Sequence, residues 1–461
     1  MINSYGNQLK NKKKSFKIPL LILLSLFAAI SLIYLLIIKL EGDKPSVTIT
    51  SDSNYIGESF IFSGTVSDRK SGIRSIWAGI LKDGKEKVLI DKQFPSKGIT
   101  GGGDLFSTSF SISIEPKSLD LTDGKAILRI AARDFSWKDW NSGNLTYIEK
   151  EVIIDTKPPR ADILTRHHNV NQGGSGLVIF RVSEPDTKSG VNVGGNFFPG
   201  HPGYFKDPYI FMAFFALAHN QDTETELFVQ TTDRAGNHSR TGFYYHLRKK
   251  RFAKDSIRIS DKFLNWKMPE FNIDFSGEKI QKFIEINQKL RKKNCGTILS
   301  LRNNSGSNIY WKDTFIRLAG SAKKAGFADF RSYRYKGKII DKQYHMGIDL
   351  ASITHSPVPA ANSGRVVFSD VEGIFGKTVV IDHGFGLFSM YSHLSSIDVK
   401  KGQEISRGDP IGRTGTTGLA GGDHLHYGMF IHNTFVNPIE WWDGSWIKNN
   451  ITSKINDVKR M

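Results

Sequence analysis

The pattern of hydrophobic and polar positions changes several times along the chain, and it begins with one long apolar run. Residues 18–38 (IPLLILLSLFAAISLIYLLII) contain no charged side chain. As a helix rising about 1.5 Å per residue, this run would be roughly 31 Å long, which matches the hydrocarbon core of a bilayer. The pattern therefore predicts a transmembrane helix over 18–39, preceded by a basic tail over 1–17.

Charged residues on either side of the apolar run predict its orientation. Five lysines lie among the first 17 residues, and Glu41 and Asp43 follow the run. Because lysine and arginine are enriched on the cytoplasmic side of membrane helices, the N-terminus is expected in the cytosol and the bulk of the chain outside it. A cleaved signal peptide is the alternative. The run is longer than a usual signal sequence and no A-x-A site ends it, so an uncleaved anchor is favoured.

From residue 44 to 157, short hydrophobic runs alternate with polar turns. The runs predict strands over 46–49, 59–66, 76–81 and 126–131. Strands at this spacing are typical of an antiparallel β-sandwich. Pro158 and Pro159 resist both helix and sheet pairing, so we expect the first sandwich domain to end at 157.

A second β-sandwich is predicted over 158–250, because its turns echo those of the first. Residues 66–72 are matched by 182–190, and residues 132–144 by 232–237. Each match joins a hydrophobic strand to a turn rich in Asp, Gly and Asn, which indicates one sandwich used twice. This unit resembles bacterial immunoglobulin-like repeats. The aspartates of these turns are expected to shape them rather than to bind Ca²⁺, namely Asp68, Asp134, Asp186 and Asp233.

Residues 251–334 lose the strand pattern and predict a short helical spacer. Over 276–294 the apolar residues recur at near-helical spacing, which indicates a helix with a basic exposed face. Phe315, Ile316 and Leu318 are assigned to a second helix. A segment that occludes a functional site, if the chain has one, is expected between residues 295 and 344.

From residue 335 to 443 strands return, with short turns between them. Runs over 364–368, 378–381 and 388–391 are β-rich. Between 402 and 428 there are eight glycines, but neither a Walker A sequence nor a strand–G-x-G-x-x-G–helix context accompanies them, so tight β-turns explain them better than a phosphate loop. Residues 444–461 are left as a C-terminal tail. The fold class is therefore multi-domain and mainly β.

Composition narrows the range of functions. The chain has 461 residues and a formal net charge of +18, which suits contact with anionic surfaces. Neither a basic recognition helix nor a C₂H₂ or RNA-binding signature accompanies the charge, so nucleic acid is not expected as a partner. The single cysteine, Cys295, excludes an internal disulfide and a thiolate zinc cluster.

Four histidines and one aspartate carry the chemistry. They are His345 and Asp349 in QYHMGIDL, His393 in MYSHL, and His424 and His426 in GDHLHYG. On a strand, residues 424 and 426 would point to the same face, with Leu425 towards the core. Two histidines and an aspartate suit Zn²⁺, and two further histidines could move protons at neutral pH. The group indicates hydrolysis.

Other polar residues nearby are weaker candidates. His355, His383 and His432 are assigned to loops or to the core, and Asp382 and Asp423 could orient a metal ligand from behind. Tyr391, Tyr427 and Phe430 are expected in the core or the cleft wall. Lys377 and Arg413 could meet substrate carboxylates, although solvated positions are favoured for both.

The sequence H-x-x-x-D, then Y-x-H-L, then a glycine-rich approach to H-L-H-Y, resembles the LytM-type (lysostaphin-like) M23 family of zinc metallopeptidases over residues 335–440. The resemblance implies an antiparallel β peptidase domain in which His345, Asp349 and His426 bind one Zn²⁺. It implies that His393 and His424 are the unliganded catalytic histidines. All five positions are present.

The resemblance implies a peptidoglycan hydrolase at the bacterial cytoplasmic (inner) membrane. Zinc would lower the pKa of bound water to around 7 and polarise the scissile carbonyl, and without an H-E-x-x-H glutamate a histidine must act as the base. Two alternatives remain: a non-enzymatic M23-like regulator that binds a wall hydrolase or a morphogenesis protein, and an adhesive envelope protein in which zinc only stabilises the fold. A lipoyl-like carrier is nearly excluded, because the chain lacks the lysine-bearing hairpin of such domains. The sandwiches could bind envelope proteins.

Overall fold

The computed structural model describes residues 17–51, 53–98 and 102–461, and these form two compact units. Unit 1 ends at Lys157 and also contains residues 234–237, and unit 2 comprises the remainder from Pro158 to Met461. Each unit has its own hydrophobic core. The predicted basic tail over 1–17 lies outside the described residues, except for Lys17.

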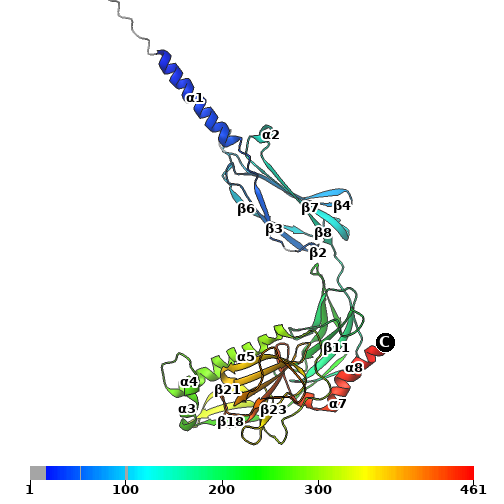
Figure 1. Ribbon diagram of the computed structural model, residues 1–461. Coiled ribbons are helices and arrows are strands. Elements are labelled where there is room, and N and C mark those ends of the chain that lie inside the picture. The colour runs from blue at the N-terminus through cyan, green and yellow to red at the C-terminus, as the bar shows by residue number, and fades with distance from the viewer. Residues whose placement is uncertain (1–16, 52, 99–101) are drawn as a thin grey trace, which may run out of the picture. The chain divides into compact units, whose positions relative to one another are not determined.

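Unit 1 begins with helix α1 (Lys17–Lys39), drawn in blue in Figure 1. Its segment Ile18–Ile37 has a mean hydropathy of 2.9 and is long and apolar enough to cross a membrane. None of that segment is buried. The end of α1 and the residues just after it are hydrogen-bonded to a later loop of unit 1. Trp137 N donates to Lys39 O (2.7 Å) and Ser136 Oγ donates to Glu41 O (3.0 Å).

The rest of unit 1 is β structure in two sheets, of order β1-β3-β6 and β2-β8-β7-β4-β5. The four predicted strands are all present, as β1, β3, β4 and β7. The elements are β1 (Ser46–Ile49), β2 (Tyr55–Ile56), β3 (Phe60–Ser67), β4 (Ile73–Lys82), β5 (Lys85–Gln93), β6 (Ser107–Ile114), β7 (Gly124–Asp134), α2 (Lys138–Asn141) and β8 (Leu145–Ile154). Alternate side chains of these strands, including Phe62, Ile80 and Leu128, form the core.

Two of the predicted turn-forming aspartates do shape turns in unit 1. Asp68 Oδ2 accepts hydrogen bonds from the backbone N–H groups of Lys70 (3.0 Å) and Gly72 (2.7 Å). Asp134 Oδ1 accepts from the backbone N–H groups of residues 136 (2.9 Å) and 144 (2.7 Å). These are the local bonds by which Asp stabilises a turn, so the expected turn-forming role is confirmed for this pair.

Unit 2 starts with a second β region, whose sheets have the orders β14-β11-β9, β13-β12-β15-β16 and β10-β17. Its strands are β9 (Ala161–Ile163), β10 (His168–Asn171), β11 (Ser175–Val182), β12 (Lys188–Val193), β13 (Asn196–Pro199), β14 (Ile210–Ala216), β15 (Leu227–Thr232), β16 (His238–Gly242) and β17 (Tyr245–Arg248). The echoed segments 66–72 and 182–190 both lead from one sheet to another, from β3 to β4 and from β11 to β12. The strand orders differ, so the immunoglobulin-like assignment stays a prediction.

Residues 251–344 mix helices with strands rather than forming a helical spacer alone. They contain β18 (Lys254–Ile259), α3 (Asp261–Lys267), α4 (Lys279–Glu285), a π-helical turn (Ile286–Leu290), α5 (Arg291–Ser300), β19 (Ala322–Ala325), β20 (Phe330–Tyr335) and β21 (Lys338–Tyr344), with 3₁₀ turns at Met268–Glu270 and Leu301–Asn304. The helix predicted over 276–294 is confirmed as the continuous stretch from α4 to α5. β18, β20 and β21 form a separate sheet.

The second helix, assigned from Phe315, Ile316 and Leu318, was wrong. The segment is not helical, because its backbone bonds to distant parts of the chain: Phe315 N donates to Trp441 O (3.0 Å) and Ile316 N donates to Ala361 O (2.8 Å). Phe315 and Leu318 are buried in the core of unit 2. Tertiary pairing therefore overrides the local apolar spacing.

An antiparallel eight-stranded sheet dominates the last part of unit 2 (Figure 1), with the order β19-β22-β30-β26-β25-β24-β28 and with β31 paired to β30. Its elements, with those around it, are β22 (Ile348–Ala351), β23 (Pro357–Pro359), β24 (Gly364–Glu372), β25 (Gly376–Asp382), β26 (Leu387–Leu394), β27 (Ser396–Ile397), β28 (Glu404–Ile405), β29 (Pro410–Arg413), β30 (Leu425–Ile431), β31 (Thr434–Val436), α6 (Ile439–Trp442), α7 (Gly444–Ile447), a π-helical turn (Lys448–Thr452) and α8 (Ser453–Arg460), with a 3₁₀ turn at Gly373–Phe375. The three strands predicted here are β24, β25 and β26.

Residues 444–461, predicted as a C-terminal tail, are helical and packed. Ile447, Ile451, Ile455 and Val458 recur at helical spacing and all are buried in the core of unit 2. That core is continuous from the second β region to these helices. Trp441, for example, lies with its ring centroid 6.1 Å from that of Phe214 in β14.

Candidate functional site

The central strands of the large sheet bring the five predicted residues together. β22 pairs with β30 so that Asp349 lies opposite His426, and His345 lies just before β22. β30 also pairs with β26, which ends in His393 and Leu394. His424 immediately precedes β30, and Leu425 between the two histidines is buried. The prediction that both histidines face one side while Leu425 faces the core is confirmed.

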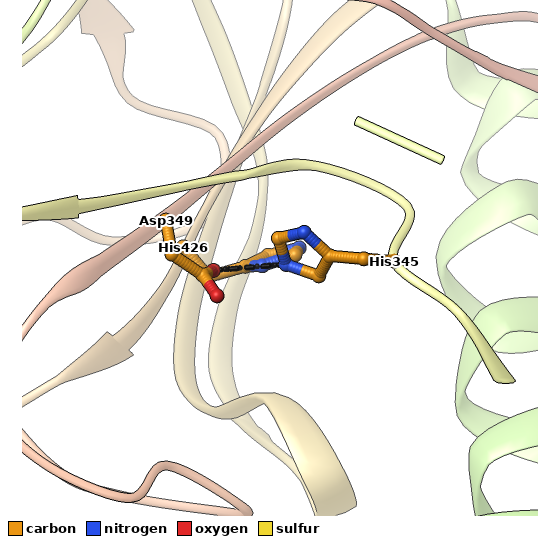
Figure 2. Close-up of side chains that lie close together, drawn as sticks. All are labelled: His345, Asp349 and His426. Carbon is orange, nitrogen blue, oxygen red and sulfur yellow. Dashed lines mark hydrogen bonds and ion pairs between the residues drawn. The ribbon is translucent and has the colours of Figure 1, made fainter. Parts of the chain in front are cut away.

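His345, Asp349 and His426 point toward one another (Figure 2). His345 Nε2 lies 2.9 Å from His426 Nδ1, and each of these nitrogens lies 2.9 Å from Asp349 Oδ1. The three side chains are nearly inaccessible, with exposed fractions of 5%, 8% and 4%. Three donor atoms therefore converge on one point inside the protein.

The donor set fits a divalent metal such as Zn²⁺. His345 Nδ1 donates to Gly326 O (2.8 Å), which leaves Nε2 without a proton in the neutral ring. A tetrahedral ion bound at about 2.0–2.1 Å would have ligand atoms roughly 3.3 Å apart, close to the spacing seen. His426 Nε2 is buried and has no hydrogen-bond partner among the described residues. Burial also lowers the pKa of His426 to about 4, so its ring is neutral as a metal ligand must be.

Arg331, which was not predicted as a site residue, holds the Asp349 carboxylate in place through the oxygen that faces away from the two imidazoles. Its NH2 group donates to Asp349 Oδ2 (2.8 Å), so the carboxylate is held with only Oδ1 turned to the two imidazoles. Burial raises the pKa of Asp349, but the charge and hydrogen bond of His345 and the bonds from His424 and His426 outweigh it and hold that pKa well below its usual range. Arg331 and Tyr333 are two positions apart in β20 and lie on the same face of that strand. The residues next to them in the sequence form no motif that would place them beside the site.

His393 and His424 are oriented by the same kind of backbone contact. His393 Nδ1 donates to Thr417 O (2.9 Å), and His424 Nδ1 donates to Gly422 O (2.8 Å). In its neutral form each ring therefore has an unprotonated Nε2, and the ring centroids lie 4.9 Å apart. His393 takes the left-handed backbone angle φ = 63°, beside an irregularity in the pairing of β25 with β26. Such strain in a residue other than glycine is concentrated at functional sites.

The two histidines differ in their surroundings. Burial, together with the charges of His424 and His426, holds the pKa of His393 well below its usual value. Burial also acts to lower the pKa of His424, but the bond to Asp349 and the charge of that carboxylate outweigh it and the pKa is raised. His424 Nε2 lies 3.6 Å from Asp349 Oδ1.

All five residues line one cavity of about 400 Å³, here called the site cavity. The large sheet supplies one wall. The other comes from the segment before it and includes Ile257 of β18, Phe263 of α3 and Phe283 of α4. The region predicted as a spacer thus forms part of the site.

The remaining sequence candidates lie outside the site cavity. His383 is fully buried between Ser363 O (2.7 Å) and Ser389 Oγ (2.7 Å), as a core histidine. Asp382 accepts hydrogen bonds from Ser305, Gly306 and Gly384, and Asp423 accepts them from His355 N and Thr414 Oγ1, so neither aspartate orients one of the three donor residues. His355 is exposed, Tyr391, Tyr427 and Phe430 are buried in the sheet, and His432 is buried in the turn after β30. Lys377 Nζ donates to Ser395 O (2.8 Å) and Arg413 to His355 O (3.1 Å), so neither basic residue reaches the cavity.

Comparison with known proteins places this geometry in a family. Peptidase family M23 matches residues 343–438, which include all five residues. The peptidoglycan DD-endopeptidase ShyA of Vibrio cholerae is 42% identical over 96 residues, which are 21% of this chain and 22% of ShyA. The DD-carboxypeptidase/endopeptidase Mpg of Neisseria meningitidis is 38% identical over 95 residues, again 21% of this chain and 22% of the relative. The chain thus spans about a fifth of the length of these curated relatives.

Solved structures show similarity of the same kind. A putative peptidase M23 from Pseudomonas aeruginosa is 19% identical with a TM-score of 0.38, covering 59% of this chain and 94% of that one. The catalytic domain of lysostaphin from Staphylococcus simulans is 26% identical with a TM-score of 0.24, covering 28% of this chain and 98% of that one. Residues 343–438 of this chain, with the converging His345, Asp349 and His426, are a Peptidase family M23 domain.

Proposed function

We propose that the chain is a zinc-dependent endopeptidase that hydrolyses peptide bonds in the stems or cross-links of peptidoglycan. One observation carries the proposal: three metal-type donor atoms lie within 2.9 Å of one another, and two more histidines line the same cavity. The substrate is inferred from the relatives, because ShyA is described as a peptidoglycan DD-endopeptidase.

The five residues divide into two roles in this proposal. His345, Asp349 and His426 hold one Zn²⁺, which would polarise the scissile carbonyl and make water a stronger acid. His393 and His424 move protons with their Nε2 atoms. One of them accepts the proton of the attacking water, and the other stabilises the oxyanion and donates to the leaving amine.

The proposal places the catalytic domain outside the cytoplasmic membrane. α1 would serve as a single-pass anchor with its N-terminus inside, since lysines precede it and acidic residues follow it. The β regions between anchor and catalytic domain would then face the cell wall, where envelope proteins could bind them. Protease added outside spheroplasts should degrade the chain after residue 43, and full protection would contradict this orientation.

Muropeptide analysis tests the activity. The full chain in detergent is incubated with purified peptidoglycan, with and without a zinc chelator, and the products are identified by mass spectrometry. We expect new fragments with free termini at a cleaved cross-link, their loss with chelator and their return when Zn²⁺ is restored. His355→Ala is the matched control, because that histidine is 62% exposed in its side chain and lies outside the site cavity.

Two outcomes would contradict the proposal. Unchanged muropeptides from the zinc-loaded protein would exclude peptidoglycan hydrolysis and favour a binding role for the site. Cleavage that persists in the chelator after the metal has been removed would exclude a zinc peptidase.

A further inference from the structure

Basic side chains gather around the site cavity, from a part of the chain that precedes residues 343–438. Arg258, Arg291, Lys324 and Arg331 line the cavity, and Asp255 and Asp349 are its acidic lining residues. Four positive and two negative side chains leave an excess of two positive charges before a metal ion is counted. A cavity with this balance favours an anionic ligand.

Lys324 reaches this cavity because of an irregularity in strand pairing. β19 pairs with β22 at the edge of the large sheet, where Lys323 lies opposite Leu350 and Ala325 lies opposite Asp349. The register shifts between these two pairs, so Lys324 is an extra residue with no opposite partner. A bulge of this kind re-aims a side chain, and here it turns Lys324 into the cavity beside the strand that carries Asp349.

Two of the four cations already have partners within the protein. Arg331 donates to Asp349 Oδ2 (2.8 Å), and Arg291 donates to Asn287 Oδ1 (2.6 Å). Lys324 and Arg258 are exposed and, among the described residues, neither makes a hydrogen bond or ion pair. Of these two, Lys324 lies on the strand that pairs with the strand of Asp349. Its ammonium group can therefore bind a ligand without breaking a contact within the protein.

The remaining walls suit the apolar part of a peptide. Ile257, Phe263 and Phe283 line one side of the cavity, and Phe375 and Leu419 line the other. A peptide chain could place its aliphatic groups on these walls, with a carboxylate turned to the basic residues. A charge-assisted bond of ammonium to carboxylate is stronger than a bond to a neutral amide.

We propose that Lys324 binds a free carboxylate of the peptide substrate, next to the bond that is cut. This inference rests on the proposed peptidase function and adds a specificity: a cross-link whose neighbouring carboxylate is free is preferred over one in which it is a primary amide. The recognition group belongs to β19, which precedes the matched family region, so the family resemblance does not supply it.

Kinetics on a matched substrate pair test the inference. Two synthetic cross-linked peptide dimers of peptidoglycan type, one with the free carboxylate and one with the primary amide, are offered to the zinc-loaded full chain. We expect kcat/KM to favour the carboxylate form about tenfold, mostly through KM. In Lys324→Gln the ratio should fall to near one, and Lys324→Arg should restore it.

Lys323→Gln is the matched control, because it removes the same charge from the adjacent, exposed position that does not line the cavity. It should keep the wild-type ratio, which separates a local contact from the general loss of positive charge. Thermal melting and zinc content of Lys324→Gln verify that the variant is folded.

The outcomes separate the inference from the function on which it rests. If wild type and Lys324→Gln cleave both dimers with the same ratio, the carboxylate subsite is wrong and the peptidase function stands. An equal loss of preference in Lys323→Gln would also overturn the subsite. If zinc-loaded wild type cleaves neither dimer, the proposed function fails and the inference falls with it.

Discussion

At the scale of single residues, metal binding and proton transfer can be separated by substitution. His345→Ala removes one of three donor atoms that lie 2.9 Å apart, so zinc affinity should fall by more than about 100-fold. His393→Ala and His424→Ala remove no donor atom from that triangle. They should keep zinc and lose about 10²–10⁴ in kcat, the usual contribution of general acid–base catalysis.

Competition with a fluorescent chelator measures the zinc affinity, and cleavage of a cross-linked peptide measures kcat. His383→Gln controls for the loss of a buried imidazole, since the bonds of the His383 ring among the described residues are to Ser363 O and Ser389 Oγ, away from the three donor residues. Full zinc affinity in His345→Ala would contradict the assignment of the ligands. Wild-type kcat in both His393→Ala and His424→Ala would contradict the proton-transfer roles.

Glu440 gives the stability of unit 2 a pH dependence of defined sign. The carboxylate is 7% exposed and accepts hydrogen bonds from Asn171 Nδ2 (2.7 Å) and Ser175 N (2.8 Å). Burial raises the pKa of Glu440 from 4.5 to about 7, despite these bonds and the charge of Lys250. The folded state thus keeps a proton that the unfolded chain loses. The stabilisation is complete below pH 4.5 and is lost as the pH rises through 7.

Glu440→Gln removes this titration and, after rotation of the Asn171 amide, preserves the hydrogen-bonding pattern. The variant should gain about 3 kcal/mol relative to wild type between about pH 4.5 and about pH 8. Urea denaturation at the two pH values measures the difference. A stability difference that does not change with pH would show that Glu440 is ionised in the folded protein at both.

Residues of the site were predictable from sequence where their spacing is local. His424 and His426 share a face because they are two positions apart near a strand, and His345 and Asp349 lie in one short segment. Arg331 was not predictable, because its contact to Asp349 depends on where the sheet of β18, β20 and β21 packs. Lys324 depends on a bulge that only the paired strands reveal.

At the scale of elements, the helix from α4 to α5 is pinned to the sheet beside it through its π-helical turn. Asn287 is fully buried there, and its Nδ2 donates to Asp341 Oδ2 in β21 (2.6 Å) while its Oδ1 accepts from Arg291 NH2 (2.6 Å). Asn287→Ala leaves both partners short of a bond and should cost about 1–3 kcal/mol of unfolding free energy.

Chemical denaturation of the full chain in detergent measures that loss. Lys289→Ala is the control in the same turn: its ion pair with Glu285 is exposed, so the change should stay within about 0.5 kcal/mol. Equal effects of the two substitutions would contradict a structural role for the buried amide.

Elements were predictable where the periodicity matched the pairing in the fold. The first apolar run forms α1 in the structure, as predicted. The shorter hydrophobic runs form strands such as β3, β7 and β25. The error at residues 315–318 has the opposite cause, since that segment satisfies its backbone groups with Ala361 and Trp441. Spacing of apolar residues shows that a segment is buried, and it does not show which backbone groups the segment will pair with.

At the scale of the whole molecule, the hydrophobic residues form two cores rather than one. Phe62, Ile80 and Leu128 belong to the core of unit 1, and the core of unit 2 extends from the second β region through the M23 domain to Val458. Sequence alone placed a boundary at Pro158, and it did not show that the second β region, the segment after it and the M23 domain share one core. Aromatic contacts such as that of Phe214 with Trp441 join segments more than 200 residues apart. A pattern of neighbouring residues in the sequence cannot predict contacts over that separation.

Separate cores predict two thermal transitions, only one of which responds to metal. All three proposed zinc ligands lie in unit 2, and a ligand bound only to a folded unit stabilises that unit by about 4 kcal/mol at 1,000 times its Kd. Calorimetry of the full chain in detergent should therefore show one transition that rises in temperature with Zn²⁺ and falls with chelator, and a second that stays constant. Phe62→Ala, which empties part of the core of unit 1 at a cost of about 3–5 kcal/mol, should lower only the metal-insensitive transition. A single transition that responds to both zinc and Phe62→Ala would instead mean that the two cores unfold as one cooperative structure.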